Sequence, residues 1–78
     1  MTITYTIQEN YPTLTKSEKK IADYILSSGE KIVHSTMSDI REATKVGDGT
    51  IIRFCQKIGF SGFSELKIAI AIEDFSKL

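Results

Sequence analysis

Hydrophobic residues recur at helical spacing along most of this chain and divide it into short segments. The first clear segment has an apolar stripe made of Ile21, Ala22 and Ile25, with Tyr24 and Leu26 beside it. Thr15 followed by Glu18 fits a capping box, in which the threonine oxygen accepts from a first-turn amide and the glutamate reaches back to the cap. Gly29 tolerates the left-handed backbone that commonly ends a helix. We therefore predict a helix over about residues 16–28.

The segment before Thr15 is less regular. It is rich in threonine and partly alternating, which favours a strand, yet Ile3, Ile7 and Tyr11 lie at helical spacing. We interpret residues 1–13 as a short helix or an ordered arm.

A second start signal lies at Thr36, which Asp39 follows three residues later. The inner face of this short helix is predicted to consist of Ile40, Ala43 and Thr44. Val46 and Gly47 then interrupt the pattern. Helical spacing resumes over about residues 48–58, with apolar positions at Ile51, Phe54, Cys55 and Ile58.

A terminal helix is predicted after Gly59, which ends the preceding helix, with Ser61 as its cap. Two adjacent apolar faces occur on it, one formed by Phe63, Leu66 and Ile70 and the other by Ile68, Ile72 and Phe75. The central IAIAI sequence alternates like a strand, but its flanks keep helical spacing and alanine is the strongest helix former. The second face either packs within the domain or meets a partner chain or a following domain.

Composition narrows the fold class and the function. Seventy-eight residues, 41% of them hydrophobic and 26% charged, suit one small globular domain. We predict a single all-α domain over residues 1–78, a four- to five-helix bundle with a homeodomain-like three-helix core and a C-terminal helix. So short a chain has no room for a catalytic cleft built from two layers, and we expect neither an enzyme nor a cofactor.

Few side chains offer other chemistry. His34 has no cysteine or second histidine at ligand spacing, so we predict a solvated loop histidine and no metal site. Cys55 cannot form an internal disulfide, and we expect a packed thiol in a protein of the reducing cytoplasm. The GDG sequence lacks the glycine spacing and the following lysine of a phosphate loop. No apolar run approaches the roughly 20 residues that span a bilayer, so no membrane partner is expected.

The two short helices within residues 36–58 fit a helix-turn-helix, in which the second helix enters the DNA major groove. The inward positions of such a unit fall at Ile40, Thr44, Val46, Ile51 and Phe54. All but the threonine are apolar. The outward face of the second helix is therefore the candidate reading surface.

Several outward side chains suit base edges. Arg53 can donate a bidentate pair to guanine, Gln56 can pair with adenine, and Asp48 can accept from cytosine N4. Ile52 can touch a thymine methyl group. The alternative for each is a solvated helix face.

Other positions suit the phosphate backbone. Thr50 and Lys57 can contact phosphates, as can the start of the last helix around Ser61, where free amides and the positive dipole end favour an anion. The complete predicted DNA-binding set is Thr36, Asp48, Gly49, Thr50, Ile52, Arg53, Gln56, Lys57 and Ser61.

The sequences LTKSEKKIADYIL (14–26) and TIIRFCQKIGFSGFSELK (50–67), with the short helix between them, resemble the N-terminal helix-turn-helix domain of the RpiR family of bacterial transcriptional regulators. The resemblance covers about residues 3–72 and places Thr50 and Arg53 at the DNA-facing start of the recognition helix. It assigns to the core Phe54, Ile58, Phe60, Phe63 and Leu66. In that family the domain typically precedes a sugar-isomerase-type (SIS) domain that binds a phosphosugar. The resemblance therefore implies either a fragment of a longer regulator or a natural stand-alone module, and we favour the fragment. Its effector would act only through that missing C-terminal domain.

This chain departs from the family pattern near the turn. Family members usually carry a small residue, a glycine and a serine cap where this chain has Arg41, Lys45 and Gly47, and Gly49 replaces a better helix former. Lys45 falls in a turn that favours positive φ, and a glycine inside a helix costs up to about 1 kcal/mol relative to alanine. We expect a loose start of the recognition helix. Either it tightens on DNA or the site has drifted. Retained binding is favoured by the presence of Thr50 and Arg53 and by the charge that Arg41 and Lys45 add near the groove.

Charge alone does not decide between DNA binding and protein interaction as the function of this chain. Ten basic and ten acidic residues cancel, although residues 41–67 carry five basic side chains against three acidic ones. We predict a sequence-specific domain for double-stranded DNA from a sugar-metabolism regulator, dimerising through the face of Ile68, Ile72 and Phe75. The alternative is a helical protein-interaction or dimerisation module without DNA binding.

Overall fold

The chain is described by a computed structural model over residues 3–76, with the side chains of residue 30 and residues 74–76 excepted. The helices of this described part are α1 (Ile3–Asn10), α2 (Lys16–Ser28), α3 (Met37–Thr44), α4 (Asp48–Lys57) and α5 (Phe63–Ser76). Short 3₁₀ helices, η1 (Tyr11–Thr13) and η2 (Gly29–His34), follow α1 and α2. The all-α prediction is confirmed, and residues 3–10 form the helix that was one of two interpretations of that segment.

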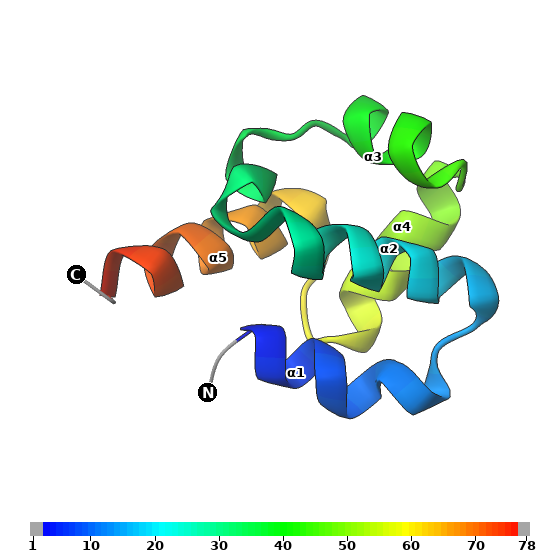
Figure 1. Ribbon diagram of the computed structural model, residues 1–78, viewed down its shortest axis with the longest axis horizontal. Helices are drawn as coiled ribbons and strands as arrows, with labels where there is room; N and C mark the ends of the chain where they lie inside the picture. Colours follow the sequence, from blue (N-terminus) through cyan, green and yellow to red (C-terminus); the bar gives the residue numbers. More distant parts are fainter. Residues whose placement is uncertain (1–2, 77–78) are drawn as a thin grey trace.

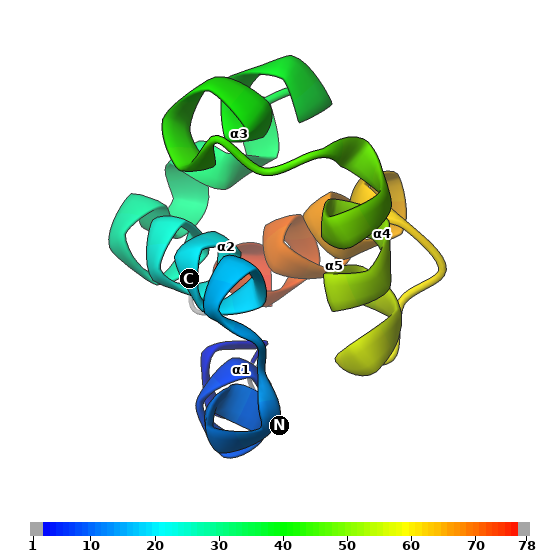
Figure 2. The ribbon, with the colours of Figure 1, turned by 90° about the vertical axis from the view of Figure 1, so that its right-hand side faces the viewer.

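The helices surround α2, which runs through the middle of the molecule (Figure 1). Turned by 90°, the same arrangement shows α3 above and α1 below, with α2 and α4 facing each other between them (Figure 2). Contacts join α2 to both α3 and α4, and α5 packs on η2, α4 and α1. The backbone N–H of Ile3 donates to Glu73 Oε2 at 2.8 Å, which ties the start of α1 to α5. The helix-turn-helix therefore packs against α2 and α5.

Helix α2 has the bounds that its capping signals predict. Thr15 Oγ1 accepts from the Glu18 amide at 3.2 Å, and the Thr15 amide donates to Glu18 Oε1 at 2.8 Å. Both bonds of the capping box are therefore present. Gly29 ends the helix with φ of 57°, a backbone angle that favours glycine.

Each of the five described α-helices contributes apolar side chains to the core. Its buried members are Ile7, Leu14, Ile21, Ala22, Ile25, Ile32, Ile40, Val46, Ile51, Phe54, Cys55, Ile58, Phe63, Leu66 and Ile70. Ile32 was not predicted, because η2 lies in a stretch without helical periodicity. Ala43 was predicted to face inward on α3 but is exposed, whereas Thr44 is buried and donates its hydroxyl to the Ile40 carbonyl at 2.7 Å.

The start and the second face of α5 differ from expectation. The helix begins at Phe63, after Gly62, and Ser61 does not cap it: Ser61 donates its hydroxyl to Glu65 instead. Ile68 and Ile72 are 61% and 64% exposed, so the interpretation in which they pack within the domain is wrong. The side chain of Phe75, assigned to the same face, lies outside the described residues.

Candidate nucleic-acid interface

The helix-turn-helix spacing predicted from the sequence is confirmed by burial. The inward positions Ile40, Thr44, Val46, Ile51 and Phe54 are all buried. Between the two helices Lys45 adopts φ of 59°, the positive angle expected of this turn. Helix α4 packs on α2 and α5 through its buried positions, and its opposite face is exposed.

The C-terminal end of α4 is tied to α2. Lys57 Nζ lies 2.8 Å from Glu18 Oε1 and donates to the Thr13 carbonyl at 3.3 Å. The Glu18 side chain is 2% exposed, whereas that of Lys57 is 37% exposed. Burial raises the pKa of Glu18, but its bonds with Lys57 and Thr15 together outweigh burial and lower that pKa overall. One carboxylate oxygen therefore serves both the cap of α2 and the attachment of α4.

The N-terminal end of α4 is held less firmly. Gly47 precedes the helix and provides no side-chain cap, and Gly49 lies in the first turn with no atom within 4 Å of a Cβ built on it. Arg41 Nε lies 3.3 Å from Asp48 Oδ1, and Arg41 Nη1 donates to Asp48 Oδ2 at 3.4 Å. Arg41 Nη2 also donates to Ser38 Oγ at 2.8 Å. The side-chain contact at this end is therefore an exposed ion pair across the turn, without a side-chain cap.

The outward side chains of α4 line the exposed surface as predicted. Asp48, Gly49, Ile52, Arg53, Gln56 and Lys57 are exposed, and Thr50 is half-buried. The Arg53 and Gln56 side chains have no polar partner among the described residues, so both remain able to bond to another molecule. Lys57 differs from them, because its ammonium already bonds within the domain.

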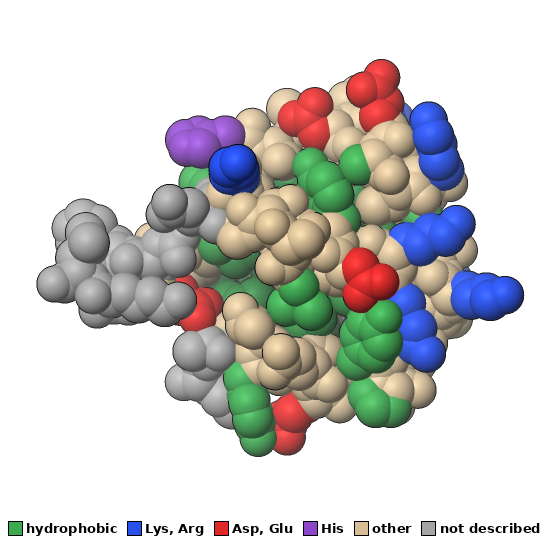
Figure 3. Space-filling model, in the orientation of Figure 1, with side chains coloured by type: hydrophobic (Ala, Val, Ile, Leu, Met, Phe, Trp, Pro, Cys, Tyr) green, Lys and Arg blue, Asp and Glu red, His purple; other side chains and the backbone are tan. Residues whose placement is uncertain are grey.

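Two residues of the predicted DNA-binding set, Thr36 and Ser61, lie outside α4. Thr36 is exposed and caps α3, where its hydroxyl oxygen accepts from the Asp39 amide at 3.2 Å. Ser61 lies with Ile52 in a shallow hollow at the start of α5, whose further lining residues are Met37, Gly62, Phe63, Ser64 and Glu65. The space-filling view shows Lys and Arg side chains gathered on the edge where α2 begins and the α3–α4 turn lies (Figure 3). Cations therefore flank the helix-turn-helix despite the neutral total charge.

Other chemistry is poorly supported in this domain. Burial raises the pKa of Cys55 to about 11, so the thiol stays protonated and packed in the core. His34 is exposed at the end of η2 instead of in a loop. Among the described residues, no three His, Cys, Asp or Glu side chains come close enough to bind a metal ion. None of the described helices has the length and apolar character needed to cross a membrane.

Sequence reasoning missed the pairing of Arg41 with Asp48. From the sequence, Arg41 was noted as a departure from the family pattern that adds positive charge near the groove, and Asp48 as an acceptor for cytosine. The two residues are seven positions apart on different helices, so no helical period relates them. The signal available in the sequence was an arginine late in one helix and an aspartate at the start of the next.

Comparisons with known proteins agree with this geometry. The family described as "Helix-turn-helix domain, rpiR family" matches residues 1–77. An HTH-type transcriptional regulator of Haemophilus influenzae is 51% identical over 63 residues, which are 81% of this chain and 22% of that protein. The HTH-type transcriptional regulator HexR of Pseudomonas aeruginosa is 35% identical over 65 residues, 83% of this chain and 23% of that protein.

A solved structure matches the fold. The crystal structure of the N-terminal domain of the transcriptional regulator YbbH from Bacillus subtilis has a TM-score of 0.81 to this chain at 36% identity, covering 91% of this chain and 88% of that one. The chain spans less than a quarter of the full length of the two regulators above. Together with the buried helix-turn-helix positions, these matches show that the chain belongs to the rpiR family as a helix-turn-helix DNA-binding domain of transcriptional regulators, and not as an enzyme.

Proposed function

We propose that the chain binds double-stranded DNA sequence-specifically, with α4 in the major groove. The observation that carries this proposal is the burial of all five inward positions, which turns Arg53 and Gln56 outward without polar partners in the described part of the chain. In a helix-turn-helix, the N-terminal residues of the second helix contact base edges while the first helix crosses the backbone. The outward face of α4 has the size and chemistry for this role.

Base reading is assigned to exposed side chains along the outward face of α4. Arg53 donates to guanine O6 and N7, Gln56 pairs with adenine, and Ile52 contacts a thymine methyl group. Asp48 accepts from cytosine N4, and Gly49 allows the backbone to approach the DNA. The phosphate contacts come from Thr36, Thr50 and the amides following Ser61. Lys57 is the weakest of the predicted contacts, because its ammonium is engaged by Glu18.

A pair of domains is the proposed binding unit. Helix-turn-helix dimers bind two half-sites about one helical turn apart, so two α4 helices enter successive major grooves. The exposed Ile68 and Ile72 are proposed as the dimer contact, together with Phe75. Helices that are apolar on more than one face are normally covered by protein, which supports this assignment.

The whole regulator is proposed to respond to a sugar phosphate. The helix-turn-helix domain precedes a C-terminal SIS-type domain in the full protein, and that domain takes the phosphosugar effector. Regulation of sugar-metabolism genes from the cytoplasm follows from this organisation. The supporting observation is that the related regulators are more than four times as long as their matched segments.

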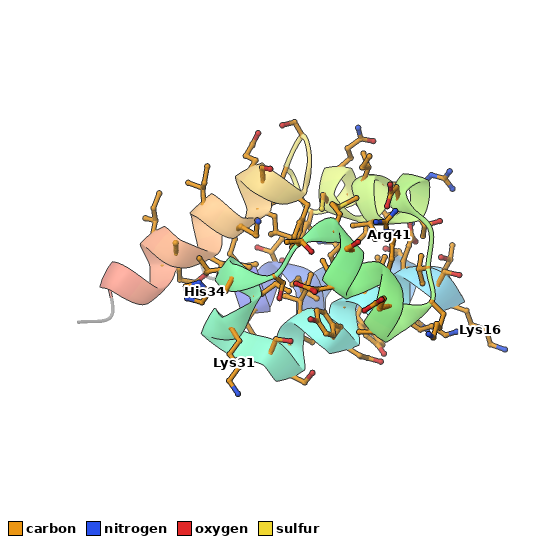
Figure 4. The ribbon with its side chains drawn as sticks, turned by 90° about the horizontal axis from the view of Figure 1, so that it is seen from above. Lys16, Lys31, His34 and Arg41 are labelled. Carbon is orange, nitrogen blue, oxygen red and sulfur yellow. The ribbon has the colours of Figure 1, made fainter. Side chains whose placement is uncertain are left out.

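Loss of Arg53 tests the DNA proposal directly. Duplexes are first selected from a randomised pool with the wild-type chain, and fluorescence anisotropy then measures binding at low salt. Arg53→Ala is expected to weaken binding by about 10-fold or more, because a bidentate arginine–guanine pair is worth about 1–3 kcal/mol. Lys31→Ala removes one positive charge on the side of α2 away from α4 and serves as the control (Figure 4). Failure of the wild-type chain to bind, or equal binding by both variants, defeats the proposal.

A protein-interaction module is the second candidate, favoured by the exposed Ile68 and Ile72 and by the net charge of zero. It predicts that the chain dimerises through α5 and retains no DNA. Sedimentation velocity of the wild-type chain and of Ile68→Asp, with and without duplex, separates the two functions. DNA retention by the wild-type chain excludes the second candidate.

A further inference from the structure

Arg41 occupies a central position on the face that a helix-turn-helix turns toward DNA. Its guanidinium joins the first turn of α3, through Ser38 Oγ at 2.8 Å, to the first turn of α4, through Asp48 at 3.3 and 3.4 Å. Figure 4 shows the side chain reaching from α3 toward α4. These two helix starts are the parts of the motif that approach the backbone and the bases. A cation placed between them lies where a phosphate would be bound.

Asp48, the partner of this cation, is poorly suited to a surface that faces DNA. Asp48 places a carboxylate on a surface that has to approach a polyanion, and only Arg41 compensates its charge among the described residues. The two side chains are 45% and 52% exposed, so water screens the pair and holds it weakly. A guanidinium binds carboxylate and phosphate oxygens with the same two-pronged geometry. The donor groups of Arg41 that hold the Asp48 carboxylate therefore suit a phosphate equally well.

We propose that Arg41 is a DNA-phosphate contact and that Asp48 is its intramolecular competitor. On binding, the guanidinium leaves the Asp48 carboxylate and pairs with a phosphate oxygen of the backbone. This inference rests on the proposed DNA-binding function and assigns a contact outside the set predicted from the sequence.

The exchange gives Asp48 a part in specificity. Once Arg41 has moved to phosphate, the carboxylate needs a new hydrogen-bond donor, and cytosine N4 supplies one. At a site without such a donor, the unpaired carboxylate faces the DNA and opposes binding. Asp48 therefore lowers affinity for DNA of arbitrary sequence more than for the correct site.

Salt dependence distinguishes an exchanged pair from a persistent one. Binding of a labelled mixed-sequence duplex of about 20 base pairs is measured by fluorescence anisotropy over a potassium chloride series, since each neutralised phosphate contributes about 0.9 to the slope of log K against log salt. The variants are Arg41→Gln and Asp48→Asn. Lys31→Gln and Glu42→Gln remove the same charges from exposed positions that have no described ion pair, and they serve as controls. Far-UV circular dichroism and the thermal midpoint verify that each variant folds.

The expected pattern is specific to exchange. Arg41→Gln lowers the slope by about 0.9, whereas Asp48→Asn keeps the wild-type slope and binds up to about five-fold tighter. A steeper slope for Asp48→Asn, with Arg41→Gln equal to wild type, shows that the pair persists on DNA and overturns the proposal. Equal slopes and affinities in all variants overturn it too, because Arg41 is then away from the DNA. No binding by the wild-type chain refutes the proposed function itself, and this inference with it.

Discussion

The two ends of α4 are held in opposite ways. At the C-terminal end, Lys57 pairs at 2.8 Å with Glu18, whose side chain is 2% exposed. At the N-terminal end, Arg41 pairs at 3.3 Å with Asp48, and both side chains are about half exposed. The first contact is partly shielded from water and salt, and the second is open to both.

We expect this difference to separate stability from the proposed DNA recognition along one helix. The shielded pair fixes α4 against α2 at the end far from its first turn, where a change in geometry would alter the whole domain. The open pair and the glycines lie at the other end, so the proposed reading surface can exchange partners at small cost. Substitutions at the two ends should therefore affect different measurements.

The largest effect is expected from Lys57→Met, which keeps the aliphatic stem and leaves the Glu18 carboxylate buried without its cation. Breaking a buried pair from one side costs about 3–5 kcal/mol, and partial exposure of Lys57 reduces this to about 1–3 kcal/mol. Urea unfolding followed by far-UV circular dichroism measures the change in free energy of unfolding. Lys31→Met is the matched control and should stay within about 0.5 kcal/mol of wild type.

Two further variants qualify that result. Lys57→Arg should recover most of the lost stability, because a guanidinium still pairs with Glu18. If Lys57→Met is as stable as its control Lys31→Met, the two ends of α4 do not differ in the way described.

A smaller effect is expected from acid. The pKa of Glu18 is lowered in the folded chain from its usual value of 4.5, so its contribution to stability is complete above about pH 4.5. That contribution is lost as the pH falls through the lowered folded-state pKa. Glu18→Gln keeps an acceptor for the Thr15 amide but does not ionise, so its stability should approach that of the wild-type chain below pH 4.5. Urea midpoints from pH 7 to pH 3 provide the test.

Glu42→Gln is the control for the acid experiment, because Glu42 is an exposed carboxylate on α3. It should retain the acid sensitivity of the wild-type chain. If the urea midpoints of the wild-type chain and of Glu18→Gln fall in parallel as the pH is lowered, the Glu18–Lys57 pair is not the cause of the acid sensitivity.

The smallest expected effect is a gain in stability from a substitution at the N-terminal end of α4. Gly49→Ala should stabilise the chain by up to about 1 kcal/mol, because alanine favours the helix and its Cβ meets no atom within 4 Å. Gly59→Ala is a contrasting control, expected to destabilise because Gly59 has φ of +98°. Thermal unfolding measures both changes. If Gly49→Ala also tightens DNA binding, the first turn of α4 is ordered by DNA in the wild-type chain; unchanged binding would mean that it is already ordered.

Local signals predicted the helices well and their contacts less well. The bounds of α2 follow from a capping box and a glycine within the same segment, so no distant residue was needed. The helix-turn-helix positions followed similarly from short spacings. By contrast, η2 offers six residues with no cap and no 3.6-residue period, and its buried Ile32 escaped prediction for that reason.

Tertiary packing accounts for the remaining differences between the sequence predictions and the structure. Ala43 and Thr44 lie at the edge of the α3 stripe, and only the position of α2 decides which of them is covered. The pairing of Lys57 with Glu18 joins residues 39 positions apart, so a solvated helix face and a structural contact were equally consistent with the sequence. The same holds for Arg41 and Asp48. The outward face of α4 was predictable because its assignment requires only knowing which side of the helix faces the core.

Cys55 makes the opening of this domain directly measurable. It is the single cysteine of the chain and lies buried in α4, where its thiol stays protonated at neutral pH. A thiol-reactive dye reacts with an exposed thiolate, so labelling has to wait until the packing around α4 opens and water reaches the sulfur. The labelling rate of the natural chain therefore reports how often α4 separates from its neighbours. Comparing that rate with and without duplex gives the protection that DNA confers on the recognition helix.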